Sequence, residues 1–311
     1  MTSSSPPPLL FTNKVVVVTG GGSGIGKALC CAFAQVGACV VVVDLRGAQT
    51  VRKTLATTTE SQHHQQQQHM DVQCDVTNPH DVAQMIRSVK HRYGKIDVFC
   101  SNAGIMIPHN KTSNGGAVVD DSCIKHSNAE WHKVFQVNVY SHVIALRELL
   151  PDWERGLGDG HFCVTASAAG LLTMVGDASY GVSKAAALSW CEHVAISHHP
   201  SVKVHCVCPQ AVDTPLVAVS KEQNAAMTDG LLTPEAVAKA TLRGIQKGDF
   251  FIFPHSQVPK YALRKAQDHT RWLKGMQRLR NKLMMQPNET AIPIIVTRRP
   301  MPNSLFWIVT N

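Results

Sequence analysis

A run of four valines that leads into closely spaced glycines constrains the fold of this chain more than any other stretch. Residues 15–18 are all valine, and Gly20, Gly24 and Gly26 follow after Thr19. An unbroken run of β-branched residues favours a strand that is buried on both faces. Glycines directly after such a strand let backbone N–H groups and a helix N-terminus approach an anionic pyrophosphate. The stretch therefore predicts a strand, a phosphate-binding turn and a helix, although the turn by itself also fits an ordinary tight turn.

An acidic residue follows the second predicted strand. Residues 39–43 are apolar, and Asp44 ends this run eighteen residues after Gly26. A carboxylate at that place can accept hydrogen bonds from the ribose hydroxyls of an adenosine. Asp44 therefore favours a dinucleotide as the ligand of the glycine turn.

A tyrosine and a lysine mark a second candidate site. Tyr180 and Lys184 lie four residues apart, so a helix would project both side chains from one face. Ser167 lies thirteen residues before the tyrosine. Taken singly, Ser167 also fits a strand-end cap, Tyr180 a buried aromatic and Lys184 an exposed helix charge. Their joint occurrence behind a glycine turn predicts a catalytic group.

Together these motifs resemble those of the short-chain dehydrogenase/reductase family, in its compact single-domain branch with T-G-x-x-x-G-I-G and Y-x-x-x-K. The resemblance covers roughly residues 14–253. It implies four catalytic residues, namely Asn138, Ser167, Tyr180 and Lys184. It also implies that a nicotinamide dinucleotide is bound by Gly20, Ser23, Gly24, Ile25, Gly26, Asp44, Asp75, Val76, Asn102, Ala103, Gly104, Tyr180, Lys184, Pro209, Val212 and Thr214.

The resemblance gives each catalytic residue a role. Tyr180 would remove the alcohol proton or return it to a carbonyl, and Ser167 would donate a hydrogen bond to the substrate oxygen. A phenol ionises near pH ~10, and we expect the Lys184 ammonium to lower the pKa of Tyr180. Asn138 would hold a water that links Lys184 to solvent. Two positions depart from the family pattern: Ser101 replaces the usual asparagine before Asn102, and Gln210 replaces the usual glycine after Pro209.

Strand and helix signals alternate along the chain, which predicts one α/β domain of Rossmann type with a doubly wound parallel sheet in the strand order 3-2-1-4-5-6-7. The expected strands are residues 15–18, 39–43, 69–74, 96–100, 161–166, 202–207 and 250–253. The expected helices are residues 25–36, 47–56, 79–93, 129–150, 180–198, 234–247 and 260–285. We divide the chain into a flexible leader (1–13), the dinucleotide-binding and catalytic domain (14–259), a basic C-terminal helix (260–286) and a tail (287–311).

Composition excludes several other classes of protein. The Ser/Pro-rich start has no charged secretory pattern, and no stretch approaches the ~20 apolar residues of a membrane span, so we expect a cytoplasmic protein. The ten cysteines form no C-x-x-C pair, which argues against zinc and against a disulfide framework. His63, His64 and His69 lie in a polar low-complexity segment, for which a solvated loop is favoured over a metal site. We therefore expect no metal.

The C-terminal segment carries the formal charge of the whole chain. From residue 260 onward ten Lys/Arg stand against two acidic residues, whereas residues 1–259 are balanced. The spacing of Trp272, Leu273, Met276 and Leu279 places them on one helix face. The segment fits a docking helix with a solvated basic face, or a helix in weak contact with an anionic membrane surface, for which we expect salt-sensitive binding. Nucleic acid is not expected, since no aromatic-interleaved groove accompanies the charge.

We predict an oxidoreductase that transfers a hydride between NAD and a secondary alcohol or ketone. Asp44 disfavours NADP because it would repel a 2′-phosphate, and residues 106–107, 171–175 and 216–219 would form a mostly apolar pocket. The loop at 106–128 fits either an insertion beside this pocket or a solvated loop. A silent dinucleotide-binding scaffold or redox sensor is the alternative. A sugar-nucleotide epimerase is disfavoured by the glycine spacing and by the lack of a second sizeable domain.

We also expect a homodimer or homotetramer, an assembly that the family resemblance implies. The interface would be built by the predicted helices at residues 129–150 and 180–198. Their apolar side chains would otherwise remain exposed on a monomer. These side chains are Val134, Val137, Ala145, Leu149, Ala187, Trp190 and Val194.

Overall fold

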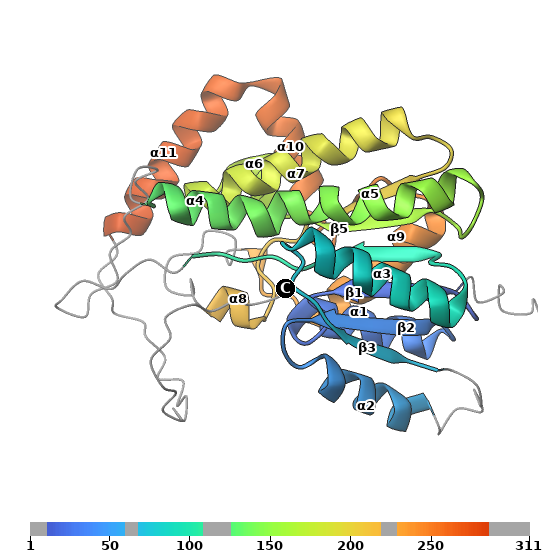
Figure 1. The fold of residues 1–311 in the computed structure, drawn as a ribbon. Coiled ribbons are helices and arrows are strands. Elements are labelled where there is room, and N and C mark those ends of the chain that lie inside the picture. The colour runs from blue at the N-terminus through green and yellow to red at the C-terminus, as the bar shows by residue number, and fades with distance from the viewer. Residues whose placement is uncertain (1–10, 60–67, 108–125, 219–228, 286–311) are drawn as a thin grey trace, which may run out of the picture.

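A computed structural model describes residues 11–59, 68–107, 126–218 and 229–285 of the chain. Its centre is a parallel sheet of seven strands in the order β3-β2-β1-β4-β5-β6-β7, as predicted (Figure 1). The strands are β1 (Val15–Thr19), β2 (Cys39–Asp44), β3 (Met70–Gln73), β4 (Val98–Ser101), β5 (His161–Thr165), β6 (Lys203–Val207) and β7 (Phe251–Ile252).

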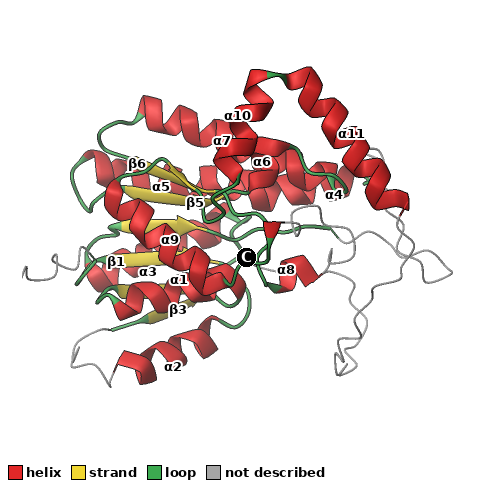
Figure 2. Ribbon diagram, turned by 180° about the vertical axis from the view of Figure 1, so that it is seen from behind, coloured by secondary structure: helices red, strands yellow, loops and turns green. Residues whose placement is uncertain are grey.

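Helices cover both faces of the sheet (Figures 1 and 2). The helices are α1 (Gly24–Gln35), α2 (Ala48–Thr59), α3 (Pro79–Tyr93), α4 (Asn128–Phe135), η2 (Gln136–Tyr140), α5 (Ser141–Glu154), α6 (Ala168–Leu172), α7 (Ala178–Ser197), α8 (Pro215–Ala218), α9 (Pro234–Lys247), α10 (Val258–Gln267) and α11 (His269–Met285). Side chains of α1, α2 and α9 pack in one core layer, and those of α3, α5 and α7 pack in the other. This arrangement is the predicted doubly wound fold.

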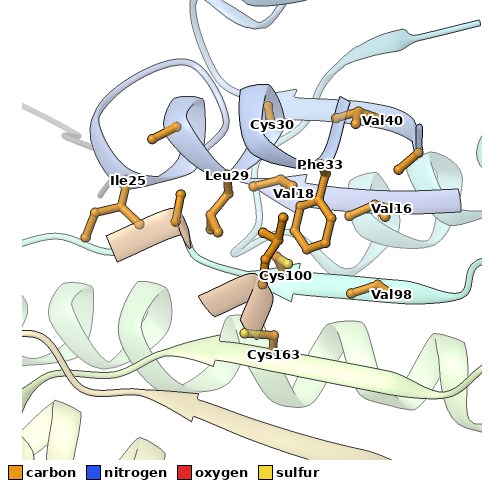
Figure 3. Close-up of a cluster of buried hydrophobic side chains, with 14 of the residues drawn as sticks. Val16, Val18, Ile25, Leu29, Cys30, Phe33, Val40, Val98, Cys100 and Cys163 are labelled. Carbon is orange, nitrogen blue, oxygen red and sulfur yellow. The ribbon is translucent and has the colours of Figure 1, made fainter. Parts of the chain in front are cut away.

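The alternation of side chains along a strand explains why valine occupies four successive positions of β1. Val16 and Val18 point into the layer of α1, whereas Val15 and Val17 point into the layer of α3. Figure 3 shows Val16 and Val18 beneath Phe33 in the first of these layers. Each valine is at most 4% exposed, which is the two-sided burial that the unbroken apolar run predicts.

Most predicted elements differ from the structure by one to four residues at an end, and three differences go further. The expected helix at 129–150 runs from α4 to α5 but contains a π-helical stretch, η2. The expected C-terminal helix is two helices, because the backbone leaves helical geometry at Asp268, whose Oδ1 accepts a hydrogen bond from Arg271 N at the start of α11. Phe11, placed in the leader by the sequence, is buried edge-to-face against Phe33 with ring centroids 5.1 Å apart. The folded part therefore begins before residue 14.

The two C-terminal helices lie beyond the carboxyl ends of the strands, on the same side as α8 (Figure 1). Val258 of α10 packs with Ala168 and Leu172 of α6, and Trp272 of α11 joins this cluster. The segment therefore docks on the domain through an apolar face. Among the described residues, every helix is too short or too polar to span a lipid bilayer.

Candidate active site

The glycine turn between β1 and α1 leaves room only for backbone. A Cβ added at Gly26 would lie 2.0 Å from the Gly20 carbonyl oxygen and 2.6 Å from Asn102 Nδ2. Gly20 and Gly24 have positive φ angles of 66° and 49°, which larger residues rarely adopt. Ser23 precedes the helix in extended conformation. The turn is thus a cradle of backbone N–H groups at a helix N-terminus, and it fits a pyrophosphate.

Asp44 is fixed beside this turn. Its Oδ2 accepts a hydrogen bond from Gly22 N at 2.8 Å, and its Oδ1 accepts one from Arg46 N at 3.0 Å. A Cβ at Gly22 would lie 2.8 Å from Asp44 Oδ2, so a larger residue there would displace the carboxylate. The hydrogen bonds hold the carboxylate at the carboxyl end of β2, where a ribose would be expected.

A cavity of about 240 Å³ lies next to Asp44. Six of the predicted cofactor residues line it, namely Gly20, Asp44, Asp75, Val76, Ala103 and Gly104. It is also lined by Leu45, Cys74, Thr77, Lys133, Gln136 and Val137, which the sequence analysis missed. Leu45, Cys74, Thr77 and Val137 directly adjoin predicted residues, whereas Lys133 and Gln136 come from α4 and η2 and adjoin none.

Asn102 holds strands together. Its backbone N donates to Thr19 Oγ1 at 3.0 Å and its Nδ2 donates to the Thr19 carbonyl at 3.0 Å, while its Oδ1 accepts from Thr165 Oγ1 at 2.9 Å. The side chain thereby joins β1, β4 and β5 below the cofactor side of the sheet. The preceding residue, Ser101, places its Oγ 2.7 Å from Nδ1 of the buried His142, and this pair accommodates the departure from asparagine.

Tyr180 and Lys184 lie one turn apart on α7, as their spacing predicts. Lys184 is fully buried, and its Nζ donates to the Thr165 carbonyl oxygen at 2.8 Å. Burial lowers the pKa of Lys184 to about 8. Its Nζ lies 5.6 Å from the centroid of the Tyr180 ring. The predicted pair is therefore brought together, with the ammonium directed at the end of β5.

The expected lowering of the pKa of Tyr180 is wrong for the protein without a ligand. Burial raises the pKa of Tyr180 to about 12, and the hydrogen bond with the Ser167 side chain opposes this rise only in part. The physical reason is desolvation of the phenolate, which outweighs the neighbouring groups. Tyr180 is 6% exposed and is therefore a protonated phenol at neutral pH in this state.

Ser167 caps a helix and also lies in the candidate active site. Its Oγ accepts a hydrogen bond from Ala169 N at 3.1 Å, which caps α6, and it lies 3.5 Å from the Pro209 carbonyl oxygen as a donor. The sequence does not predict α6, because its five residues are too few to show a helical period. The cap suggested as an alternative for Ser167 is present, and it also directs the side chain toward Tyr180.

Asn138 lies in η2 and is buried. Its Oδ1 accepts from Ile105 N at 2.8 Å, and its Nδ2 donates to the Ile105 carbonyl at 2.9 Å and to Ser183 Oγ at 3.0 Å. Asn138 thus joins the loop after β4 to α7 one residue before Lys184. A π-helical turn often marks a functional position, because it re-aims one side chain. The water link predicted for Asn138 stays a prediction.

A larger cavity of about 320 Å³ lies against Tyr180 and Ser167. It is lined by four more predicted cofactor residues, namely Ile25, Pro209, Val212 and Thr214, and by the expected apolar residues Met106, Leu172, Met174, Val175 and Leu216. Ser23, Gly24, Gly26, Asn102, Asn138 and Lys184 line neither cavity and support the site from below or beside it.

The C-terminal helices form one wall of this larger cavity, which the sequence analysis missed. Trp272, Met276 and Leu279 of α11 line it together with Tyr261 and Arg264 of α10. The apolar spacing of the first three was a usable signal, but the sequence does not show what such a face covers. Leu273, assigned to the same face, is 45% exposed and points away.

Gln210 links this wall to the loop after β6. Its Nε2 donates to Asp229 Oδ2 at 3.1 Å, and Tyr261 donates its hydroxyl to Asp229 Oδ1 at 3.0 Å. Gln210 N donates to Nδ1 of His255 at 3.1 Å. The glutamine that replaces the usual glycine therefore has a structural role, since it connects the cavity floor to α10.

Within the described ranges, no group of three or more His, Cys, Asp or Glu is placed to hold a metal ion. His63 and His64 lie outside those ranges. His69 is buried, and its Nδ1 accepts a hydrogen bond from Val40 N at 3.2 Å. His69, which directly precedes β3, therefore accepts a hydrogen bond from the neighbouring strand β2.

Comparison with known proteins decides the family. The sequence model of the family described as short chain dehydrogenase matches residues 14–225. The chain belongs to this family. The match contains the glycine turn, Asp44, Ser167, Tyr180 and Lys184, and it ends before the helices α10 and α11.

Relatives of this short-chain dehydrogenase agree in fold and class. A 1-deoxy-11-beta-hydroxypentalenate dehydrogenase of Streptomyces arenae is 30% identical over 76% of this chain and 80% of its own length. A D-beta-hydroxybutyrate dehydrogenase of Rhizobium meliloti is 26% identical over 81% of this chain and 91% of its own length. A short chain dehydrogenase/reductase of Burkholderia phymatum, solved with NAD, matches with a TM-score of 0.68 at 23% identity and covers 83% of this chain and 95% of its own. The short-chain dehydrogenase described here is accordingly an oxidoreductase of alcohols and ketones.

Proposed function

We propose that this short-chain dehydrogenase interconverts an apolar secondary alcohol and its ketone with NAD(H) as the cofactor. One observation carries the proposal: Tyr180 and Ser167 line a mostly apolar cavity, with the cation of Lys184 buried behind them. The apolar lining suits a hydrophobic carbinol better than a sugar. The hydroxypentalenate relative, whose name denotes a hydroxylated substrate, supports an alcohol as the reacting group.

Four residues divide the chemistry. When bound, the nicotinamide ring accepts or donates the hydride. In the reducing direction the phenol of Tyr180 gives its proton to the carbonyl oxygen as the hydride reaches the carbon. In the oxidising direction the phenolate of Tyr180 takes the hydroxyl proton of the alcohol as the C–H bond breaks. Ser167 donates a hydrogen bond to the substrate oxygen, whose charge changes during the reaction. Lys184 supplies positive charge behind the phenol, and Asn138 positions α7 against the loop after β4.

NAD is proposed rather than NADP because of Asp44. Its carboxylate faces the expected ribose position and would repel a 2′-phosphate. Arg46 is the one nearby cation on the same loop, and its backbone N already donates to Asp44 Oδ1. That hydrogen bond supports an Asp44 that is fixed for a ribose diol.

Removal of the Tyr180 hydroxyl tests the reaction. Tyr180→Phe should lower kcat by about 10²- to 10⁴-fold, the usual contribution of a general acid/base, while the affinity for NADH stays within about twofold of the wild type. Turnover would be followed by NADH absorbance with a panel of apolar secondary alcohols, and cofactor binding by NADH fluorescence.

Tyr140→Phe is the matched control, because Tyr140 is 50% exposed and lies outside both cavities. Full activity of the Tyr180→Phe enzyme would contradict the proposed mechanism. A wild-type protein that binds NADH but oxidises no alcohol of the panel would instead favour the silent scaffold.

Three further proposals concern the molecule as a whole. A homodimer or homotetramer is proposed from the family, and weak contact of the basic C-terminal segment with anionic lipid is proposed from its charge. A cytoplasmic location is proposed as well. It is supported by nine cysteines of the described ranges that carry free thiols, which suits a reducing compartment.

A further inference from the structure

The larger cavity is apolar along its length and charged at one place. Tyr180 and Ser167 form its reacting end, and Trp272, Met276 and Leu279 belong to its C-terminal wall. Of the described residues that line it, only Asp229 and Arg264 carry a formal charge. The substrate of such a cavity needs an apolar body, and the two charged residues decide what polar group that body carries.

Both carboxylate oxygens of Asp229 already accept hydrogen bonds from other residues of the chain. Its Oδ1 accepts the hydroxyl hydrogen of Tyr261 at 3.0 Å, and its Oδ2 accepts from Gln210 Nε2 at 3.1 Å. A carboxylate with both oxygens engaged is a poor anchor for a cationic ligand. Asp229 therefore serves to connect α10 with the loop after β6.

Arg264 has no such partner. In the part of the chain that the structure describes, no carboxylate lies within ion-pair distance of its guanidinium. Its Cζ lies 5.8 Å from the centroid of the Tyr261 ring, which orients the group by a cation–π contact. Arg264 is exposed as well as cavity-lining, so it lies where the cavity meets solvent. Its planar donors match a carboxylate in a two-point hydrogen bond.

Lys265, the cation next to Arg264 on α10, makes hydrogen bonds within the chain. Lys265 Nζ donates to the Leu171 carbonyl oxygen at 2.6 Å and to Thr173 Oγ1 at 3.1 Å. These hydrogen bonds dock α10 on α6 and its following turn. Lys265 is therefore a structural residue, and Arg264 remains the cation that is presented to a ligand.

We propose that the substrate is an apolar hydroxy or oxo acid whose carboxylate pairs with Arg264 at the mouth of the cavity while its carbinol or carbonyl carbon meets Tyr180. The inference rests on the proposed function for the reaction itself, and it adds the carboxylate and its receptor. Arg264 lies outside the part of the chain that the family model matches, so the selectivity is a property of this C-terminal segment.

A binding experiment tests the carboxylate without turnover. Decanoate and decanol, which share one apolar chain, would be titrated into the full-length protein while tryptophan fluorescence is followed, since Trp272 lines the cavity. The wild type should bind decanoate more tightly than decanol. Arg264→Gln should raise the Kd for decanoate about tenfold and leave that for decanol unchanged. Added salt should weaken only the part of the affinity for decanoate that depends on Arg264.

Arg271→Gln is the matched control, because Arg271 is exposed on α11 and does not line the cavity. It removes the same charge and should leave both affinities unchanged. Thermal melting checks that both variants fold, and Arg264→Lys should recover part of the affinity. Equal affinity of the wild type and Arg264→Gln for decanoate overturns the proposal, as does an equal loss with Arg271→Gln.

Turnover separates this inference from the proposed function. A mid-chain hydroxy fatty acid and its primary amide would be assayed with NAD. Arg264→Gln should raise KM for the acid about tenfold with kcat retained and should leave the amide unaffected. Turnover of acid and amide with equal KM overturns the carboxylate inference and keeps the reaction. Arg264-dependent binding of decanoate without turnover of any alcohol overturns the reaction and keeps the carboxylate site.

Discussion

Asp44 is held by the turn that it faces, and this geometry supports the proposed preference for NAD. The two hydrogen bonds from Gly22 N and Arg46 N point the carboxylate at the cradle. Asp44→Ala should therefore lower kcat/KM for NAD by about ten- to hundredfold, since a hydrogen bond to a charged group contributes about 1.5–3 kcal/mol. The same change should raise kcat/KM for NADP relative to NAD. Initial rates with both cofactors give this ratio.

Asp44→Asn separates charge from shape in this experiment. The amide keeps the size of the side chain and one acceptor oxygen, so it should reduce the repulsion of a 2′-phosphate with less disturbance of the turn. A wild-type enzyme that uses NADP as efficiently as NAD would show that Asp44 does not select the cofactor.

Single residues also show where sequence reasoning stops. The spacing of Tyr180 and Lys184 predicts that the side chains share a helix face, and they do. The pKa of Tyr180 depends on its burial in a cluster with Met106 and Leu216, which are distant in sequence. Lys184 likewise directs its Nζ to Thr165 on another strand, a contact that no local spacing reveals.

At the scale of elements, the C-terminal helices present two different faces. Trp272 and Met276 line the cavity, whereas Leu263 and Leu273 are 59% and 45% exposed among basic side chains. Each Lys or Arg near anionic lipid contributes roughly 1 kcal/mol, and this attraction weakens within a Debye length. The full-length protein should therefore co-sediment with phosphatidylserine vesicles at low salt and be released at high salt.

Variants of the exposed face test this contact while sparing the cavity. Leu273→Gln combined with Lys274→Gln should reduce the co-sedimented fraction with unchanged melting temperature and activity. Truncation before α10 is a poorer test, because it also removes Tyr261, Arg264 and Trp272 from the cavity wall. If the full-length protein stays in the supernatant at low salt, the segment is a docking helix alone.

Elements with local stop and start signals were predictable from the sequence. The helix α3 begins at Pro79 after an Asn78 cap, and α9 begins at Pro234 after a Thr233 cap. The π-helical stretch around Asn138 was not predictable, because tertiary packing sets it. The break at Asp268 was not predicted either, because it depends on a single aspartate cap. The placement of α10 and α11 over the cavity depends on contacts with α6, which the sequence analysis did not contain.

At the scale of the whole molecule, six of the seven residues predicted for the interface are buried in the monomer, and the seventh, Trp190, is partly buried against the core. Val134, Ala145, Leu149 and Ala187 are at most 3% exposed within a single chain, and Val137 and Val194 are 5% exposed. These side chains fill the cores of the monomer. The exposed large apolar residues of the same described helices are Tyr140 at 50%, Val182 at 48% and, near the end of α7, Ile196 at 80%.

If the protein forms a homo-oligomer, we therefore expect Tyr140 and Val182 to lie in the contact between subunits. Light scattering should give two or four times the monomer mass of 33.9 kDa at micromolar concentration. Val182→Glu should raise the dissociation constant at least about tenfold, because it places a charge in an apolar contact.

Leu157→Glu is the control for this assembly, since Leu157 is 47% exposed in the turn between α5 and β5 and belongs to neither η2 nor α7. It should leave the mass unchanged. A monomer mass for the wild type across this concentration range would contradict the proposed assembly.

The cavity wall has a consequence for how this enzyme is made and how it diverges. The residues proposed to hold the dinucleotide end at Thr214, whereas Arg264 and Trp272 belong to the last described helices of the chain. During translation, the cofactor residues are therefore synthesised before those of the proposed substrate wall. Over generations, residues 258–285 can vary to suit a new substrate without disturbing the cradle at Gly26. The residues proposed to select the substrate thus lie in a different part of the chain from those proposed to hold the cofactor.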